Sequence, residues 1–115
     1  MRRDSQLFLK HIRDSINDVE NYTRGVTLNS FLVYTNKEKQ DAVIRKIEII
    51  GEAVKNLPED FKQKHPEIAW QKIAGMRNKL IHQYFGVDLE LVWEVAKNNL
   101  PVLKNQIEEL LNEPA

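Results

Sequence analysis

The segment IAWQKIAGMRNKLIHQYFGVD, residues 68–88, gathers side chains that could act on a phosphodiester. Its apolar residues recur at helical spacing, which predicts a helix. On such a helix, Asn78 and His82 are i,i+4 neighbours. Tyr84 lies seven positions after Arg77 and returns nearly to the same azimuth. We therefore expect one helix face to present a fixed cation, an amide, an imidazole and a phenol.

These groups suit the cleavage of RNA without a metal ion or any other cofactor. An imidazole titrates near neutral pH and can remove the proton of a ribose 2′-OH. A guanidinium can stabilise the charge that builds on phosphorus. We assign His82 as the base or acid and Arg77 as the charge stabiliser, while Asn78 would orient the phosphate or the imidazole. Lys79 is an additional candidate for RNA binding.

Arg77 interrupts an apolar stripe, and this placement also has a purely structural explanation. An unpaired guanidinium is costly to bury and cannot lose its charge, so Arg77 must meet a carboxylate, a ligand anion or an open cleft. Glu52 and Asp41 are candidate carboxylates, although both also fit an ordinary solvated helix face. The spacing alone leaves open a salt-bridged arginine beside a structural histidine. The stripe consists of Trp70, Ile73, Ala74, Leu80, Ile81 and Tyr84.

Helical spacing of apolar residues continues through almost the whole chain and predicts an all-α fold. We expect one domain, residues 1–115, built as an up-and-down bundle of four to five helices. Residues 27–36 should form a short helix and a loop, and a helical turn should lie between the prolines at 58 and 66. The long helices are expected from a cap at Asp4 or Ser5 to about Thr23, from about Asn36 to Asn56, from near Glu67 to about Tyr84, and from a cap at Asp88 nearly to the C-terminus.

Three residues inside the expected helices should have local structural effects. Pro101 removes a hydrogen-bond donor and clashes with the preceding turn, so we expect a kink or break near Asn99. Gly51 and Gly75 each cost a helix about 1 kcal/mol relative to alanine, which indicates close helix approach at both positions. The seam of the second long helix should be Val43, Ile47, Ile50, Val54 and Leu57.

The composition limits the classes of function. The 17 basic and 17 acidic residues balance, so any RNA-binding surface must be a local patch. The absence of cysteine excludes a disulfide framework and a cysteine nucleophile. No apolar run is long enough to span a bilayer, and we expect a cytoplasmic protein. His11 and His65 are expected on the surface. Trp70 and Trp93 are expected to anchor the core or an interface.

The segment RNKLIHQY, residues 77–84, resembles the Arg-x4-His-x-Tyr motif of the HepT-like toxins in the HEPN superfamily. IIGEAVKNLP at 49–58, the longer segment 68–88 and Trp93 are also similar to that family in order and spacing. The resemblance implies a metal-independent endoribonuclease toxin of a type II or type VII toxin–antitoxin system. It implies a helical HEPN-like homodimer in which Arg77, Asn78 and His82 of two protomers line an RNA-cleaving cleft. It further implies a minimal nucleotidyltransferase antitoxin that adenylylates Tyr84.

The residues themselves also favour a dimer. Acid–base cleavage is best served by two proton-transfer groups, and a twofold axis beside the motif would bring in a second His82. Trp70, Ile73 and Ile81 extend the apolar stripe farther than one small bundle requires. Two other interpretations stay open: a non-catalytic helical subunit that binds a nucleotidyltransferase, and a helical bundle with a buried arginine ion pair.

Overall fold

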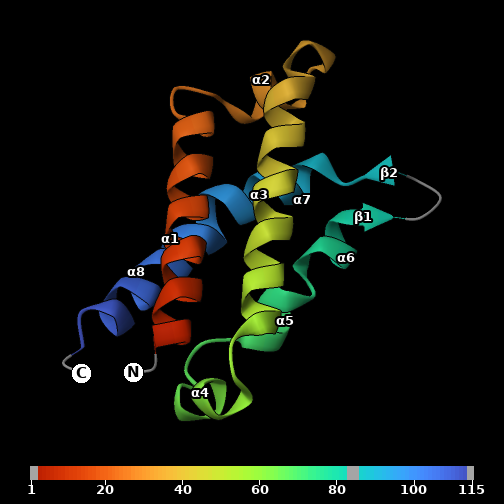
Figure 1. Ribbon diagram of the computed structural model, residues 1–115. Coiled ribbons are helices and arrows are strands. Elements are labelled where there is room, and N and C mark those ends of the chain that lie inside the picture. Colours follow the sequence, from red (N-terminus) through yellow and green to blue (C-terminus); the bar gives the residue numbers. More distant parts are fainter. Residues whose placement is uncertain (1–2, 83–85, 114–115) are drawn as a thin grey trace.

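The computed structural model describes residues 3–82 and 86–113. Two long helices, α1 (Arg3–Thr23) and α3 (Lys37–Asn56), lie side by side, and α8 (Leu100–Leu111) packs against α1 (Figure 1). The fold is the predicted all-α, HEPN-like bundle, with a single pair of two-residue strands in the described part of the chain. The shorter elements are α2 (Leu28–Leu32), the 3-10 turn η1 (Tyr34–Asn36), α4 (Glu59–Lys64), α5 (Trp70–Ala74), α6 (Met76–Leu80), β1 (Ile81–His82), β2 (Gly86–Val87), α7 (Leu89–Glu94) and the π-helical segment η2 (Val95–Asn99).

The core lies between α1 and the two helices that pack against it, α3 and α8, and it confirms the predicted seam of α3. Each of these helices is amphipathic, so its apolar stripe is removed from water when the bundle forms. Phe8 of α1 is only partly buried, and Leu9 beside it is fully buried. The most buried side chains include Leu9, Ile12, Ile16 and Val19 of α1, Val43, Ile47, Ile50 and Val54 of α3, and Leu100 and Ile107 of α8.

Local signals fix the ends of several helices. The Thr27 side chain accepts from the Ser30 amide, and the Ser30 side chain accepts from the Thr27 amide, which is a capping box at the start of α2. Asp88 accepts from the Leu91 amide at 3.1 Å and caps α7, as predicted. Pro101 lies in the first turn of α8, directly after η2. The missing donor of Pro101 accounts for the interruption that the sequence predicts there.

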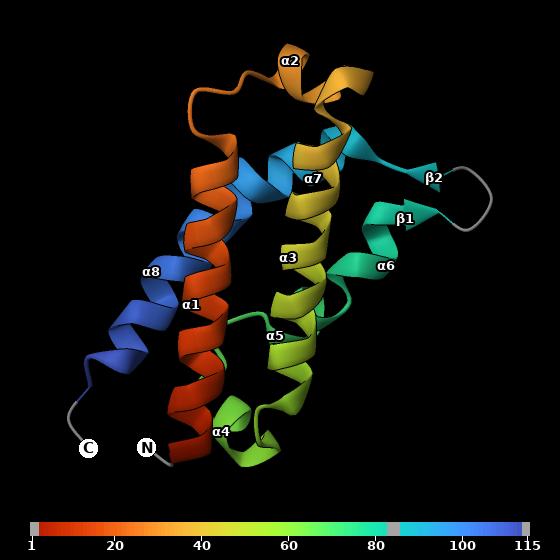
Figure 2. The ribbon, with the colours of Figure 1, turned by 45° about the horizontal axis from the view of Figure 1, so that its top comes forward.

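The predicted single helix from Glu67 to Tyr84 is wrong. Gly75 separates α5 from α6, and Ile81 has extended backbone angles, φ −110° and ψ 113°. β1 and β2 then pair antiparallel, with Ile81 opposite Val87 and His82 opposite Gly86. The φ of +80° at Gly86 is one that a glycine adopts without strain. Pairing across this reversal therefore replaces the last expected helical turn, and the strands project from the side of the bundle (Figure 2).

The close packing predicted at Gly51 is confirmed. A Cβ at Gly51 would lie 3.3 Å from the Ala74 carbonyl oxygen and 3.5 Å from that of Ile73, so α5 approaches α3 at this glycine. The same prediction for Gly75 is wrong, because a Cβ there would lie at an ordinary 3.5 Å from the Gln71 carbonyl oxygen. Gly51 therefore sets how near the segment that carries Arg77 comes to α3. No helix of the described residues is long and apolar enough to cross a membrane.

Candidate active site

Arg77 is anchored by a carboxylate on the neighbouring long helix. Its Nε donates to Oε2 of Glu48 at 2.9 Å, and the pair joins α6 to α3. The expected contact between Arg77 and a carboxylate is confirmed, whereas the alternative of a buried arginine ion pair is wrong, because the side chain of Arg77 is 53% exposed. The break at Gly75 and the end of α6 at Leu80 explain this, because residues 70–84 do not form one continuous face.

The carboxylate that pairs with Arg77 belongs to Glu48 and not to either candidate from the sequence, Glu52 or Asp41. Asp41 pairs with Lys37 at 3.0 Å, and Glu52 has no ion pair with another described residue. Glu48 lies three residues before Gly51, so on α3 it shares the side that α5 and α6 approach. The glycine was the sequence signal that could have identified Glu48, since the residues one turn from a close helix contact face the same neighbour.

The ion pair leaves much of the guanidinium available. Glu48 accepts a hydrogen bond from Nε only, and neither terminal Nη group is hydrogen-bonded to another described residue. Two N–H groups in a planar fork match two oxygens of a phosphate. The Glu48 carboxylate therefore orients Arg77 without saturating it, and the arginine can bind an anion from the open side.

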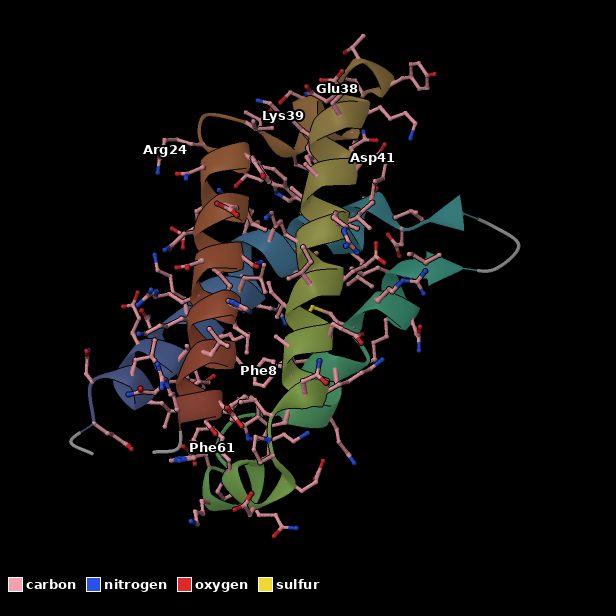
Figure 3. All side chains as sticks on the ribbon, in the orientation of Figure 1. Phe8, Arg24, Glu38, Lys39, Asp41 and Phe61 are labelled. Carbon is pink, nitrogen blue, oxygen red and sulfur yellow. The ribbon has the colours of Figure 1, made fainter. Side chains whose placement is uncertain are left out.

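Arg77 and Asn78 line one cavity of about 540 Å³ between α1, α3 and the α5–α6 segment. Figure 3 shows Phe8, part of its apolar wall, between α1 and α3. The cavity also brings in His11 and Arg45, which the sequence did not place near the motif. The full lining is Phe8, His11, Arg45, Glu48, Ile49, Gly51, Glu52, Ala53, Lys55, Asn56, Ala74, Arg77 and Asn78.

The remaining motif residues are not on the helix that the sequence predicted. His82 lies on β1, where its backbone is paired with Gly86, so it is not an i,i+4 neighbour of Asn78 on one helix. The His82 side chain and the whole of Tyr84 lie outside the described residues. Lys79 is exposed but lines a different cavity, of about 550 Å³, between α6 and the C-terminal helices.

The aromatic residues have packing roles, as predicted. Trp70 is 7% exposed, and its Nε1 donates to the His65 carbonyl at 3.0 Å. Trp93 is partly buried, with its ring centroid 5.1 Å from that of Phe31. His11 is exposed, as predicted, whereas His65 is half-buried against the ring of Phe61, so its predicted surface position is wrong.

The predicted apolar surplus around Arg77 is wrong as well. Trp70 and Ile73 are buried within the protomer, and Ile81 packs partly against the same core. Trp70 lies against Phe61 of α4, and α5, which carries Trp70 and Ile73, packs against α3, so these two side chains leave no uncovered stripe among the described residues. A dimer therefore needs other support than this stripe.

A family model described as Ribonuclease HepT-like matches residues 12–110. The chain belongs to the HepT-like ribonuclease family. It is 47% identical over 110 residues to a Thermococcus cleftensis protein named "Probable ribonuclease HepT", and the match covers 96% of this chain and 98% of the relative. No solved structure matches the chain.

Two further relatives are of different lengths. The chain is 50% identical over 113 residues to a Methanocaldococcus jannaschii protein whose name combines gamma-glutamylcyclotransferase with a provisional RNase assignment. That match covers 98% of this chain and 50% of the relative, so the chain spans half the length of that protein. A Caldanaerobacter subterraneus protein with a provisional RNase name is 40% identical over 104 residues, covering 90% of this chain and 91% of the relative. HepT-like chains thus occur both at about this length and within a longer protein.

Proposed function

We propose that this HepT-like chain is a metal-independent endoribonuclease that cleaves RNA at the cavity of Arg77 and Asn78. The observation that carries the proposal is the Glu48–Arg77 pair, because it fixes a guanidinium at an open cavity while its terminal amino groups bind no other described residue. The names of the relatives support an RNase, and the order Arg77, Asn78, His82 supports the same site.

The chemistry follows from the roles of these groups. The ribose 2′-oxygen attacks phosphorus while His82, or the second His82 of a dimer, takes its proton. The bond from phosphorus to the 5′-oxygen breaks, and that oxygen receives a proton from the other His82 of the dimer, which acts as the acid. The products are a 2′,3′-cyclic phosphate and a 5′-hydroxyl. Arg77 binds the non-bridging oxygens as charge builds on them, and Asn78 donates to the same phosphate or holds the imidazole.

The proposal extends to a homodimer and to a toxin–antitoxin pair of type II or type VII. The need for two proton-transfer groups supports a composite cleft, and the balanced net charge supports it too, because two copies of Arg77 in one cleft concentrate positive potential. The partner would be a nucleotidyltransferase antitoxin that adenylylates Tyr84. The added phosphate would occupy the place of the RNA phosphate. RNA and this partner are both intracellular, so the proposal places the chain in the cytoplasm.

Expression in cells tests the proposed site. Wild type should arrest growth, and His82→Ala should abolish the arrest while the far-UV circular dichroism stays helical. An equally toxic His82→Ala variant would overturn the assignment of His82. If wild type is not toxic and leaves purified RNA intact, the chain acts instead as a non-catalytic subunit that binds a nucleotidyltransferase.

Mass spectrometry of protein co-expressed with a nucleotidyltransferase tests the partner. One or more AMP additions on Tyr84 are expected, and Tyr84→Phe should carry none. Neutralised toxicity without any addition would contradict adenylylation and leave occlusion by the partner. Light scattering at micromolar concentration should report a dimer, and a monomer that cleaves RNA at the full rate on dilution would contradict the composite cleft.

A further inference from the structure

A third cavity, of about 740 Å³, lies between α4 and α5, beside the cavity of Arg77, and is called the α4–α5 cavity below. Lys55 and Ala74 line both cavities, so the two hollows are neighbours across these residues. Trp70 and Ile68 contribute to its wall, and both are buried. The lining is Lys55, Glu59, Lys62, Gln63, Pro66, Ile68, Ala69, Trp70, Gln71, Lys72 and Ala74.

The wall of the α4–α5 cavity carries a net positive charge in a chain with no net charge. It holds Lys55, Lys62 and Lys72 against the single carboxylate of Glu59. A cation-lined hollow in an otherwise balanced surface raises the local concentration of anions. The ligand it suits is therefore an anion that reaches it from the neighbouring cavity.

The three lysines do not have the same role. Lys62 is 13% exposed, and its Nζ donates to the Val54 carbonyl at 3.2 Å and pairs with Glu59 at 3.0 Å. It therefore satisfies a carbonyl at the C-terminal end of α3 and is structural. Lys55 and Lys72 are exposed, and neither has an ion pair or hydrogen bond with another described residue. These two ammonium groups are available to an incoming ligand.

We infer that the α4–α5 cavity binds the sugar–phosphate backbone of the RNA strand next to the nucleotide cleaved at Arg77, with Lys55 and Lys72 as phosphate contacts. The inference rests on the proposed function, which places the reactive phosphate at Arg77. A positive groove that continues from the reactive phosphate is how proteins follow a single strand. The Trp70 ring is buried and its Nε1 is bonded to the protein, so it offers no stacking face to a base. This part of the site therefore reads the backbone and not the sequence.

The test is the salt dependence of binding to a single-stranded RNA of about twelve nucleotides, within the range that single-strand binding modules cover, with 2′-O-methyl groups to prevent cleavage. Fluorescence anisotropy compares wild type with Lys55→Ala/Lys72→Ala. The control is Arg24→Ala/Lys39→Ala, which removes the same charge from exposed residues far from α4, at the opposite end of the bundle in Figure 3. All four positions are on the surface, so both variants should fold.

Each lost phosphate contact should reduce the slope of log K against log salt by about 0.7, so the lysine variant should lose about 1.4. If the proteins bind equally in 1 M salt, this predicts about 25-fold weaker binding in 0.1 M salt. The control should keep the wild-type slope.

Equal slopes for the two double variants would overturn the inference, because charge alone would then explain any loss. Undetectable binding of this RNA to wild type would overturn it as well. The proposed function fails separately: its failure is a wild type that cleaves no RNA, whereas the anisotropy experiment uses an RNA that cannot be cleaved.

Discussion

Replacing Glu48 by glutamine should separate the activity of this protein from its stability. The substitution keeps the size of the side chain and an acceptor for the Arg77 Nε, but it removes the charge. Exposed ion pairs contribute about 0.2–1 kcal/mol, and the side chains of Arg77 and Glu48 are 53% and 28% exposed. We therefore expect the melting temperature of Glu48→Gln to fall by no more than about 5 °C.

The effect on cleavage should be much larger. Without the negative charge, the hydrogen bond that the Arg77 Nε donates is weaker, so the direction of the terminal amino groups is held less firmly. Misplacing a catalytic group by about 1 Å costs up to about 100-fold in rate, so we expect kcat to fall by about 10- to 100-fold. KM for RNA should not rise, because the cavity loses a negative charge.

Glu52→Gln is the matched control. Glu52 lies on the same helix, lines the same cavity and has no ion pair with another described residue. Both variants remove one negative charge, so any general gain in RNA affinity is shared. Single-turnover cleavage and thermal unfolding followed by circular dichroism measure the two quantities. Full kcat in Glu48→Gln, or an equal loss in Glu52→Gln, would refute the orienting role of Glu48.

Three further predictions concern how the scaffold holds the site, and thermal or chemical unfolding measures each. Gly51→Val should destabilise the protein by about 1–3 kcal/mol, because even the Cβ of the new side chain would lie 3.3 Å from the Ala74 carbonyl oxygen. An unchanged stability would contradict the tight approach of α5. The hydrogen bond that Lys46 donates to the Asp18 carboxylate raises the pKa of Lys46, so the pair stabilises the fold at neutral pH and the benefit is lost as pH rises past 10.5 through the raised pKa. Asp18→Asn should therefore melt below wild type at pH 7, with a gap that narrows above pH 10.5, and a constant gap would contradict this. Asp88→Ala should lose the cap of α7 and about 1 kcal/mol, and no loss would show that the Leu91 amide finds another acceptor.

The sequence predicted the first two long helices well because their signals are local. The helix expected from about Asn36 to Asn56 is α3, Lys37–Asn56, and the cap expected at Asp88 is present. An amphipathic stripe and a capping side chain act within a few residues of one another, so they can be recognised without knowing the rest of the fold.

The end of α6 could not be predicted in this way. Helical spacing of apolar residues continues through the motif, whereas the backbone of Ile81 pairs with Val87 beyond the chain reversal. A pairing between two segments competes with the helix, and nothing in the spacing of one segment reveals it. The partner of Arg77 could have been found, because Gly51 marks the side of α3 that meets α5 and Glu48 lies about one turn before it.

Arg77 is proposed to promote metal-independent attack of a ribose 2′-oxygen, and the chemical identity of the product ends shows whether this reaction occurs. A labelled RNA is incubated in EDTA with wild type or Arg77→Ala, and the product ends are identified by mass spectrometry. We expect 2′,3′-cyclic phosphate and 5′-hydroxyl ends with wild type, and at least about 100-fold slower cleavage with the folded Arg77→Ala variant. Products with 3′-hydroxyl and 5′-phosphate ends, formed only when a divalent cation is added and at the same rate by Arg77→Ala, would contradict it.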